Sequence, residues 1–391
     1  MTESAVRPAA RVDLLRVAIC LACGLGLLLS LRLWLSSRAY PLTPLWKNLP
    51  PIPLPFDYLL FGFLLTLLAS VAIFPGKVNF LTAFLLIAVA LCVMDQSRWQ
   101  PWFYQYVFML AAFALYGRTR SEQNDDRLLN TCRLILVTLY FWAGVQKLGV
   151  GFIDQIFPSL VNPYLHFLFG RGNVIPRPFI AMLPLVEIGI GIGLLTRRFR
   201  NVSVVLALLM HLIVLSLLVP LRREIVIWPW NVAMMCFVVI LFWRTSDFTW
   251  RDVVISRPLS FKMLVLLLFG IMPLFNLFGL WDSYLSGSLL SGHLNAARIT
   301  ISDSVKQRLP ANIQQHAEAT PNSGEWNINP VRWSLSELNV PPYSEPRVFK
   351  SIARSICSYA ESNHDVTLTV FSGRGRLTGQ RTAQTYDCSQ L

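Results

Sequence analysis

Residues 178–220 read PFIAMLPLVEIGIGIGLLT-RRFRN-VSVVLALLMHLIVLSLLVP, two apolar runs separated by a short basic link. An α-helix rises about 1.5 Å per residue, so a run of about 20 residues crosses the apolar core of a bilayer. The link at 197–201 joins the two runs into an antiparallel pair. The stretch therefore predicts a helical hairpin inside a membrane.

The composition of the 391-residue chain extends this prediction to most of its length. Apolar residues make up 54% and charged residues 14%, against roughly 25% charged in soluble proteins. We expect an all-α polytopic membrane bundle over residues 1–282 and a small α+β extracytoplasmic domain over residues 283–391. About nine spans are predicted, at 12–36, 56–75, 78–95, 102–117, 129–149, 178–196, 202–220, 228–243 and 261–281.

The distribution of basic residues predicts the orientation. Of the Lys and Arg residues in the loops, thirteen lie on the side of the N-terminus and seven on the other side. Because cytoplasmic loops carry the excess of basic residues, we expect a multi-pass cell (inner) membrane protein with a cytoplasmic N-terminus. An odd number of spans then places the C-terminal domain outside. Most of the net charge of +13 belongs to residues 1–282, where it reflects these loops rather than a nucleic-acid-binding surface, so no nucleic-acid partner is expected.

The C-terminal region shows a globular pattern. Alternation predicts strands at 298–302 and 365–371, with 382–388 pairing with the second, and helices at 312–319 and 347–360. Cys357 and Cys388 are the two cysteines of this region, and the other five fall in predicted spans. An exported domain is exposed to oxidising conditions, so we predict a disulfide between these two.

Lys147 is the first candidate functional residue, because it lies near the end of span 129–149. Gly144, Ala143 and Tyr140 share its helical face, and two of these three are small. Lys147 is therefore expected to border space for another helix or a ligand, with Tyr140 and Gly144 lining it. The alternative is a lysine that extends to the interface and anchors the helix end.

Glu187 and His211 are ionisable residues deep within the hairpin quoted above. Each lies about ten residues from the predicted cytoplasmic end of its span, roughly 15 Å deep. A Glu187–His211 pair at this depth would either relay protons or satisfy the two groups structurally.

An aromatic segment, WQPWFYQY at 99–106, follows span 78–95. Trp99, Trp102 and Tyr104 are candidates for the lining of a ligand pocket, and the alternative is an interfacial aromatic belt. The sequence contains no metal-ligand spacing, Ser/His/Asp set, Walker loop or dinucleotide fingerprint, so no metal site is predicted.

Three segments together resemble known membrane proteins. YFWAGVQKL at 140–148 resembles the lysine-bearing helix of vitamin K-dependent γ-carboxylases and of their bacterial relatives, the horizontally transferred transmembrane (HTTM) domain family. DQSRWQPWFY at 95–104 is similar to the tryptophan-bearing segment ahead of the carboxylase histidine, and EIGIGIGLL at 187–195 resembles DoxX-type proteins. The resemblance covers roughly residues 10–280.

This resemblance implies a role for Lys147. In the carboxylases a lysine helps to turn vitamin K hydroquinone into a strong base, which implies a quinone or hydroquinone ligand here. Trp102 stands where the carboxylases have their histidine, and Gln146-Lys147 replaces their lysine pair. The resemblance therefore supports the membrane architecture more than glutamyl carboxylation.

Two functional hypotheses follow. In the first, the chain is an extracytoplasmic-side membrane enzyme or redox accessory that handles a quinone or another lipid-soluble ligand, with Lys147 as base or anion-binding group. In the second, the bundle is a non-enzymatic anchor or scaffold that presents the C-terminal domain to a protein partner. Transport is disfavoured because the sequence has no detectable inverted repeat.

Overall fold

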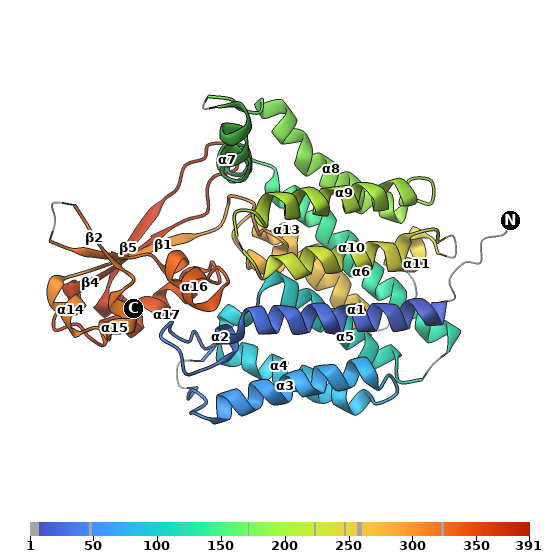
Figure 1. The fold of residues 1–391 in the computed structure, drawn as a ribbon, viewed down its shortest axis with the longest axis horizontal. Helices are drawn as coiled ribbons and strands as arrows, with labels where there is room; N and C mark the ends of the chain where they lie inside the picture. Colours follow the sequence, from blue (N-terminus) through green and yellow to red (C-terminus); the bar gives the residue numbers. More distant parts are fainter. Residues whose placement is uncertain are drawn as a thin grey trace.

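A bundle of long helices joined at one end to a small sheet domain makes up the computed structural model (Figure 1). It describes residues 8–46, 49–119, 121–170, 172–222, 224–245, 248–255, 260–321 and 324–391. The chain is mostly helical, at 65%. Six of the loop charges used above to predict the orientation lie outside the described residues: Arg7, Lys47, Arg120, Arg171, Arg223 and Arg257.

Each of the nine predicted spans contains a helix of this bundle. These are α1 (Pro8–Leu29) followed by the short α2 (Leu31–Trp34), α3 (Phe56–Ile73), α4 (Val78–Met94), α5 (Pro101–Tyr116), α6 (Glu122–Lys147), α8 (Arg177–Leu195), α9 (Arg200–Leu218), α10 (Ile227–Phe242), and a last segment made of α12 (Ser260–Val265), a π-helical stretch η3 (Leu266–Ile271) and α13 (Met272–Asn276). Two short helical turns lie between members of this set: η1 (Gln96–Arg98) between α4 and α5, and α11 (Trp250–Val254) between α10 and α12.

Five of these helices are long and apolar enough to cross a membrane: α1, α3, α6, α8 and α9. The apolar helices α4, α10 and Phe261–Asn276 are shorter. The bundle is apolar inside, where Leu15, Phe84 and Ile135 are fully buried, and also outside, where Leu59 and Phe179 are exposed. Helices that are apolar all round are typical of a membrane environment.

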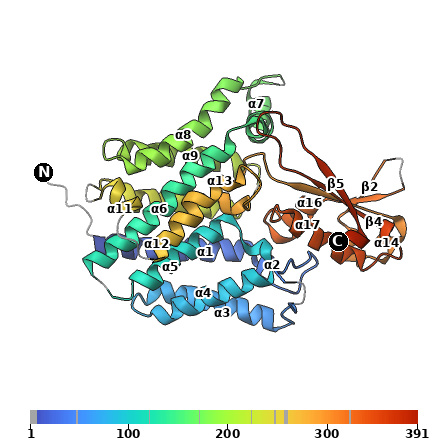
Figure 2. The same cartoon turned by 180° about the vertical axis from the view of Figure 1, so that it is seen from behind.

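Helix α7 (Phe157–Phe169) was not predicted from the sequence. After a π-helical turn, η2 (Phe152–Ile156), α7 lies across the bundle axis at the end that carries the sheet domain, as Figures 1 and 2 show. Its last turn is apolar and exposed, with Phe167 at 87%. Pro163 lies within α7 and interrupts the pattern from which a helix would be predicted.

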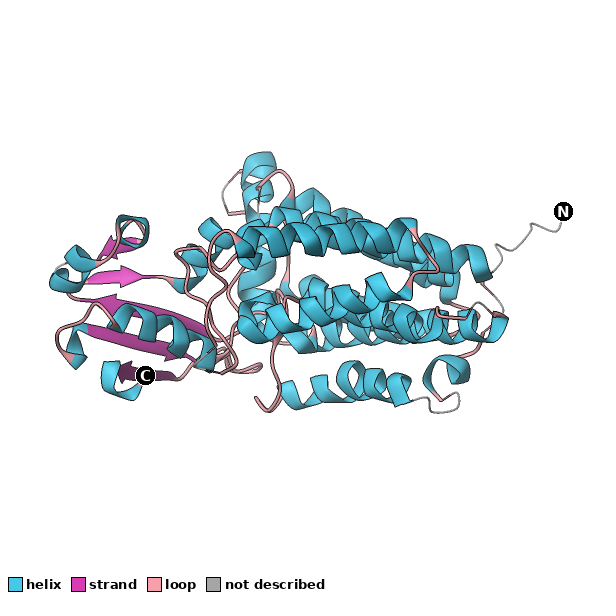
Figure 3. Ribbon diagram, turned by 90° about the horizontal axis from the view of Figure 1, so that it is seen from below, coloured by secondary structure: helices cyan, strands magenta, loops and turns pink. Residues whose placement is uncertain are grey.

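The C-terminal domain is a five-stranded antiparallel sheet in the order β2-β3-β1-β4-β5, with helices packed on it (Figure 3). Its elements are η4 (Tyr284–Ser286), β1 (Ala296–Ile301), α14 (Asp303–Arg308), α15 (Ala311–Gln314), β2 (Ala317–Ala319), β3 (Trp326–Ile328), α16 (Pro330–Leu338), α17 (Pro346–Cys357), η5 (Asn363–Asp365), β4 (Val366–Phe371), β5 (Ala383–Asp387) and η6 (Cys388–Gln390). β4 pairs with β5 as predicted. The predicted helix 312–319 is wrong beyond Gln314, because residues 317–319 form β2 and pair with β3.

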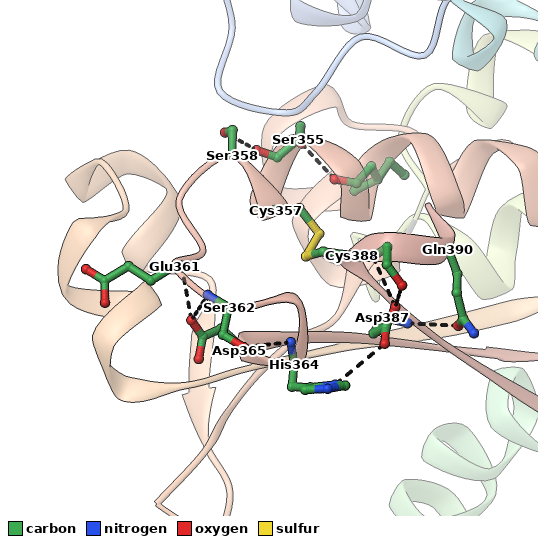
Figure 4. The surroundings of a disulfide bond; sticks show 12 residues. Ser355, Cys357, Ser358, Glu361, Ser362, His364, Asp365, Asp387, Cys388 and Gln390 are labelled. Atoms are coloured by element: carbon green, nitrogen blue, oxygen red, sulfur yellow. Dashed lines mark hydrogen bonds and ion pairs between the residues drawn. A yellow bond between two sulfur atoms is a disulfide. The ribbon is translucent and has the colours of Figure 1, made fainter.

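The predicted disulfide between Cys357 and Cys388 is formed (Figure 4). It joins the end of α17 to η6, the last turn of the chain. One face of α17 buries Val348, Ile352 and Ile356 at helical spacing. The disulfide therefore closes the C-terminal end of the domain onto the helix that covers its sheet.

The C-terminal domain is docked on the bundle through polar side chains. Asn339 Nδ2 donates to the carbonyl of Leu29 at the end of α1, at 2.9 Å. Arg347 binds Gln96 Oε1 at 2.7 Å and also pairs with Asp282. The domain therefore lies at the end of the bundle where α1 finishes.

Candidate functional site

The candidate site begins with a charge pair between α6 and α8. Lys147, the last residue of α6, places Nζ 2.5 Å from Glu187 Oε2 in the middle of α8. The side chains are 17% and 10% exposed, so both charges are largely removed from solvent. Neither alternative from the sequence describes Lys147 fully, because its ammonium turns inward to a counter-charge.

Gly144 allows α6 and α8 to approach closely enough for this pair. A Cβ atom at Gly144 would lie 2.6 Å from the carbonyl oxygen of Pro184 and 2.8 Å from the amide nitrogen of Ile188. Gly191 makes a similar close approach to the backbone of Phe141. Of the two occupants expected beside Gly144, another helix or a ligand, the structure shows the helix: the backbone of α8 fills this space.

A second polar group, His211 with its two partners, lies on the same face of α6. Tyr140 Oη is 2.7 Å from His211 Nε2 on α9, and His211 Nδ1 is 2.8 Å from Asn231 Oδ1 on α10. Asn231 Nδ2 donates to the carbonyl of Ile227, which fixes the orientation of the amide. His211 Nδ1 therefore donates to Asn231, and Nε2 accepts the hydroxyl proton of Tyr140.

The expected direct pair of Glu187 and His211 is wrong. Glu187 is bound by Lys147, and both ring nitrogens of His211 are occupied by Tyr140 and Asn231. Tyr140 and Lys147 are seven residues apart on α6, roughly 10 Å along its axis. The structure thus brings four of the predicted residues together, with partners different from those expected.

The three aromatic candidates pack elsewhere in the bundle. Trp102 lies against α1, where its ring would be 2.8 Å from a Cβ at Gly26. Tyr104 stacks on Phe269 of η3 with ring centroids 4.6 Å apart, and Trp99 meets Tyr104 edge-on at 6.1 Å. None of these contacts involves Lys147 or Glu187. The three rings therefore belong to the packing of α5 rather than to the site.

Arg38 is a residue whose role the sequence did not indicate. It binds Asp95 at 2.5 Å, and Asp95 also accepts hydrogen bonds from Thr43 and Ser97. Arg98 lies beside this cluster and donates to backbone carbonyls at the ends of neighbouring helices, including that of Leu33. These buried charges are matched by partners, so the cluster fixes the loop between α2 and α3 against α4.

Arg376 connects the C-terminal domain to the end of α6. Its guanidinium donates to the carbonyls of Val145 and Gln146 and to the side chain of Gln146, next to Lys147. In return, the amide of Val150 donates to the carbonyl of Arg376 at 2.9 Å. The hairpin between β4 and β5 thus reaches the bundle near α7, as Figures 1 and 2 show, and covers the helix end that carries Lys147.

His293 supports this hairpin from the bundle side of the sheet. Its Nδ1 lies 2.9 Å from the carbonyl oxygen of Arg374, and burial lowers the pKa of its ring below the usual value. A Cβ atom at Gly149 would meet the ring at 2.7 Å, so the chain leaving α6 passes directly beside it. His293 therefore acts at the junction as a neutral hydrogen-bond partner.

Comparison of the chain with protein-family models, with curated proteins and with solved structures gave no match. Within the described ranges, no three His, Cys, Asp or Glu side chains gather as metal ligands. The arrangement at Lys147 and Glu187 offers an ammonium, a carboxylate and a neutral hydrogen-bonded Tyr140–His211 pair. Such a set can bind a polar group and exchange a proton with it.

Proposed function

We propose that this chain is a membrane enzyme or redox accessory that handles a quinone or another lipid-soluble ligand at the Lys147–Glu187 pair. The observation that carries the proposal is the 2.5 Å contact between Lys147 Nζ and Glu187 Oε2 within a helical bundle. Ionisable residues are costly in such surroundings and commonly mark functional sites. Their residual exposure leaves the pair open to a small ligand.

The proposal includes nine membrane crossings, with the N-terminus in the cytoplasm and the C-terminal domain outside. The ends of α1 and α6 both contact the C-terminal domain, through Asn339 and Arg376. With α3, α4 and α5 between them, α1 and α6 are the first and fifth crossings and should finish on one side. The Lys/Arg asymmetry of the loops then places that side outside, where the disulfide is also expected to persist.

The chemistry proposed for the pair is a proton exchange. A hydroquinone hydroxyl that reaches the site would give its proton to the Glu187 carboxylate, while the Lys147 ammonium stabilises the oxyanion that remains. Tyr140 is held by its hydrogen bond to His211, and this bond fixes α6 against α9 beside the pair.

The resemblance to γ-carboxylases, HTTM domains and DoxX-type proteins supports a lysine-based site at this position. We do not extend the proposal to glutamyl carboxylation. Trp102, which stands in place of the carboxylase histidine, is 2% exposed and packs against α1. A ring in that position is unable to take the place of a catalytic histidine at the Lys147–Glu187 pair.

Binding measurements on the full-length detergent-purified protein test this function. A short-chain ubiquinone and its hydroquinone are titrated into the wild type, Lys147→Met and Glu187→Gln. We expect the wild type to bind the hydroquinone and both variants to bind it at least about tenfold more weakly. Arg177→Gln, which removes an exposed ion pair with Asp154, is the control and should bind as the wild type does. Equal binding by all four proteins would contradict the proposal.

A scaffold that presents the C-terminal domain to a protein partner is the second candidate. Its support is that residues 283–391 build a five-stranded sheet with buried apolar side chains, such as Ile299 and Leu368, and a disulfide. Under this function, deletion of residues 285–391 abolishes recruitment of the partner and Lys147→Met leaves it unchanged. Loss of function in Lys147→Met with the domain still docked would exclude a pure scaffold.

A further inference from the structure

A polar cleft of about 920 Å³ lies between the bundle and the C-terminal domain. One wall is formed by residues 32–39, in α2 and the segment after it, together with Tyr58 of α3. The opposite wall comes from α15, β2 and α16. The cleft shares no residue with the Lys147 site, and its volume is that of a small-molecule site.

The two acidic groups of the cleft, Glu337 and Glu318, are both held by partners within the protein. Glu337 Oε1 accepts from the amides of Ala39 and Tyr40, and its Oε2 accepts from Trp333 Nε1. Glu318 pairs with Arg332 on the opposite wall. Arg332 balances the charge of Glu318, whereas Glu337 keeps its negative charge and is stabilised by three N–H donors.

Arg32 is the cation of the cleft lining that has no carboxylate partner among the described residues. The guanidinium of Arg38, a few residues later, forms an ion pair with Asp95 and donates hydrogen bonds to backbone carbonyls. Arg32 is exposed, and its guanidinium makes no hydrogen bond or ion pair within the part of the chain that the structure describes. Arg32 thus offers a free guanidinium to the cleft, whereas the other two cations of the lining, Arg38 and Arg332, are bound to carboxylates.

Neutral donors complete the polar lining. The ring of His316 stacks on Trp333 with centroids 5.5 Å apart, and burial lowers the pKa of His316 so that it stays neutral near pH 7. Asn312 and Gln315 place side-chain amides beside it. A guanidinium with neutral amide and imidazole donors suits an anionic oxygen group such as a phosphate.

The bundle side of the cleft continues into apolar surface. Tyr58 lines the cleft, and its neighbours Phe56 and Leu59 at the start of α3 are exposed. This end of α3 belongs to a helix apolar enough to lie in a membrane. A ligand with a polar head and an apolar chain fits both surfaces at once.

We propose that this cleft binds the phosphate head group of an anionic phospholipid, with Arg32 as the charge partner and the acyl chains along the start of α3. Such a lipid would contact bundle and C-terminal domain together and would fix the domain at the membrane surface. The site is independent of the function proposed for Lys147.

Calorimetric titration of the full-length protein in detergent tests the site with three probes: short-chain phosphatidylglycerol, short-chain phosphatidylcholine and inorganic phosphate. We expect phosphatidylglycerol to bind most tightly. Arg32→Gln should weaken it by about tenfold or more, because a charge-assisted hydrogen bond is lost. Asn312→Trp, which fills the cleft from the other wall, should abolish binding, and Arg177→Gln should leave it unchanged.

Each contrary result removes the proposal. Equal binding of phosphatidylglycerol by the wild type, Arg32→Gln and Asn312→Trp would show that the cleft is not the site. If phosphatidylcholine bound as tightly as phosphatidylglycerol, the net negative charge of the lipid would not contribute to binding. Inorganic phosphate binding as tightly as phosphatidylglycerol would identify a soluble anion rather than a lipid as the ligand.

Discussion

Lys147 Nζ lies 2.5 Å from Glu187 Oε2, and this contact joins the end of α6 to the middle of α8. Gly144, three residues before Lys147, permits the contact because the backbone of α8 occupies the place of its missing side chain. A small residue beside a membrane lysine therefore admits a helix that carries the counter-charge. The pair is structural and also the best candidate for chemistry.

Breaking the pair from one side should destabilise the protein. Lys147→Met leaves the Glu187 carboxylate buried without its partner, and Glu187→Gln does the same to Lys147; each should cost about 3 kcal/mol. The double variant should cost less than the sum, because no charge is left unpaired. Thermal unfolding in detergent measures the three values.

The control for this cycle is the pair of Arg177 and Asp154, with side chains 67% and 43% exposed. Arg177→Gln should change the unfolding free energy by less than about 1 kcal/mol. Additive effects in the Lys147 and Glu187 cycle would mean that the two side chains do not interact in the membrane protein.

Tyr140→Phe should reveal the hydrogen bond to His211. Removal of the hydroxyl leaves buried His211 Nε2 without its donor, at a cost of about 1–3 kcal/mol. Tyr386→Phe, in which an exposed hydroxyl is lost, should have little effect. The unfolding temperatures of the two variants are compared with that of the wild type. Equal temperatures for the two variants would argue against the hydrogen bond between Tyr140 and His211.

The sequence predicted the positions of the bundle helices well, because the length of an apolar run is a local property. It did not predict which faces of the helices meet. Glu187 and His211 were expected to pair from their depth alone. The rotation of α8 and α9 about their own axes instead places Glu187 beside Lys147 and His211 beside Tyr140. Such rotation depends on long-range packing, which Gly144 and Gly191 determine through close contacts.

In the C-terminal domain, the strength of the local sequence pattern also determined which strands were predicted. The strand at 366–371 alternates over six residues and was predicted. The disulfide between Cys357 and Cys388 was predicted from the expected oxidising compartment and from the number of cysteines in the domain. Strands β2 and β3 have only three residues each and lack a recognisable period. The role of Arg376 at the end of α6 depends on the docking of the whole domain, so the sequence could not indicate it.

Stability should depend on pH through Glu345. Burial raises the pKa of this carboxyl from 4.5 to about 7, next to Asp282. Because the folded state holds the proton more tightly than the unfolded state, the unfolding free energy should fall as pH rises from 4.5 to about 7. The full change is on the order of 3 kcal/mol. Denaturant titrations across this range measure it.

Glu345→Gln tests the assignment of this pH dependence. The amide still accepts from the amide of Ser283 but does not titrate, so the fall between these pH values should shrink. Glu361→Gln, at an exposed carboxylate, should keep the wild-type profile. An unchanged slope in Glu345→Gln would assign the effect to another group.

The disulfide should stabilise the C-terminal domain. Cys357→Ser with Cys388→Ser removes a cross-link between residues 31 apart in sequence, and typical values for such a loop are about 2–4 kcal/mol. Cys236→Ser is the control, since that cysteine is free. Urea unfolding is measured under oxidising and under reducing conditions. The two unfolding midpoints should differ for the wild type and should be the same for the double variant.

The account depends most directly on whether Lys147 and Glu187 hold a lipid-soluble molecule. Mass spectrometry of small molecules extracted from the purified protein measures this for the wild type, Lys147→Met and Arg177→Gln. We predict a quinone or related molecule that is retained by the wild type and by Arg177→Gln and is absent from Lys147→Met. Identical extracts from the three folded proteins would contradict the proposed site.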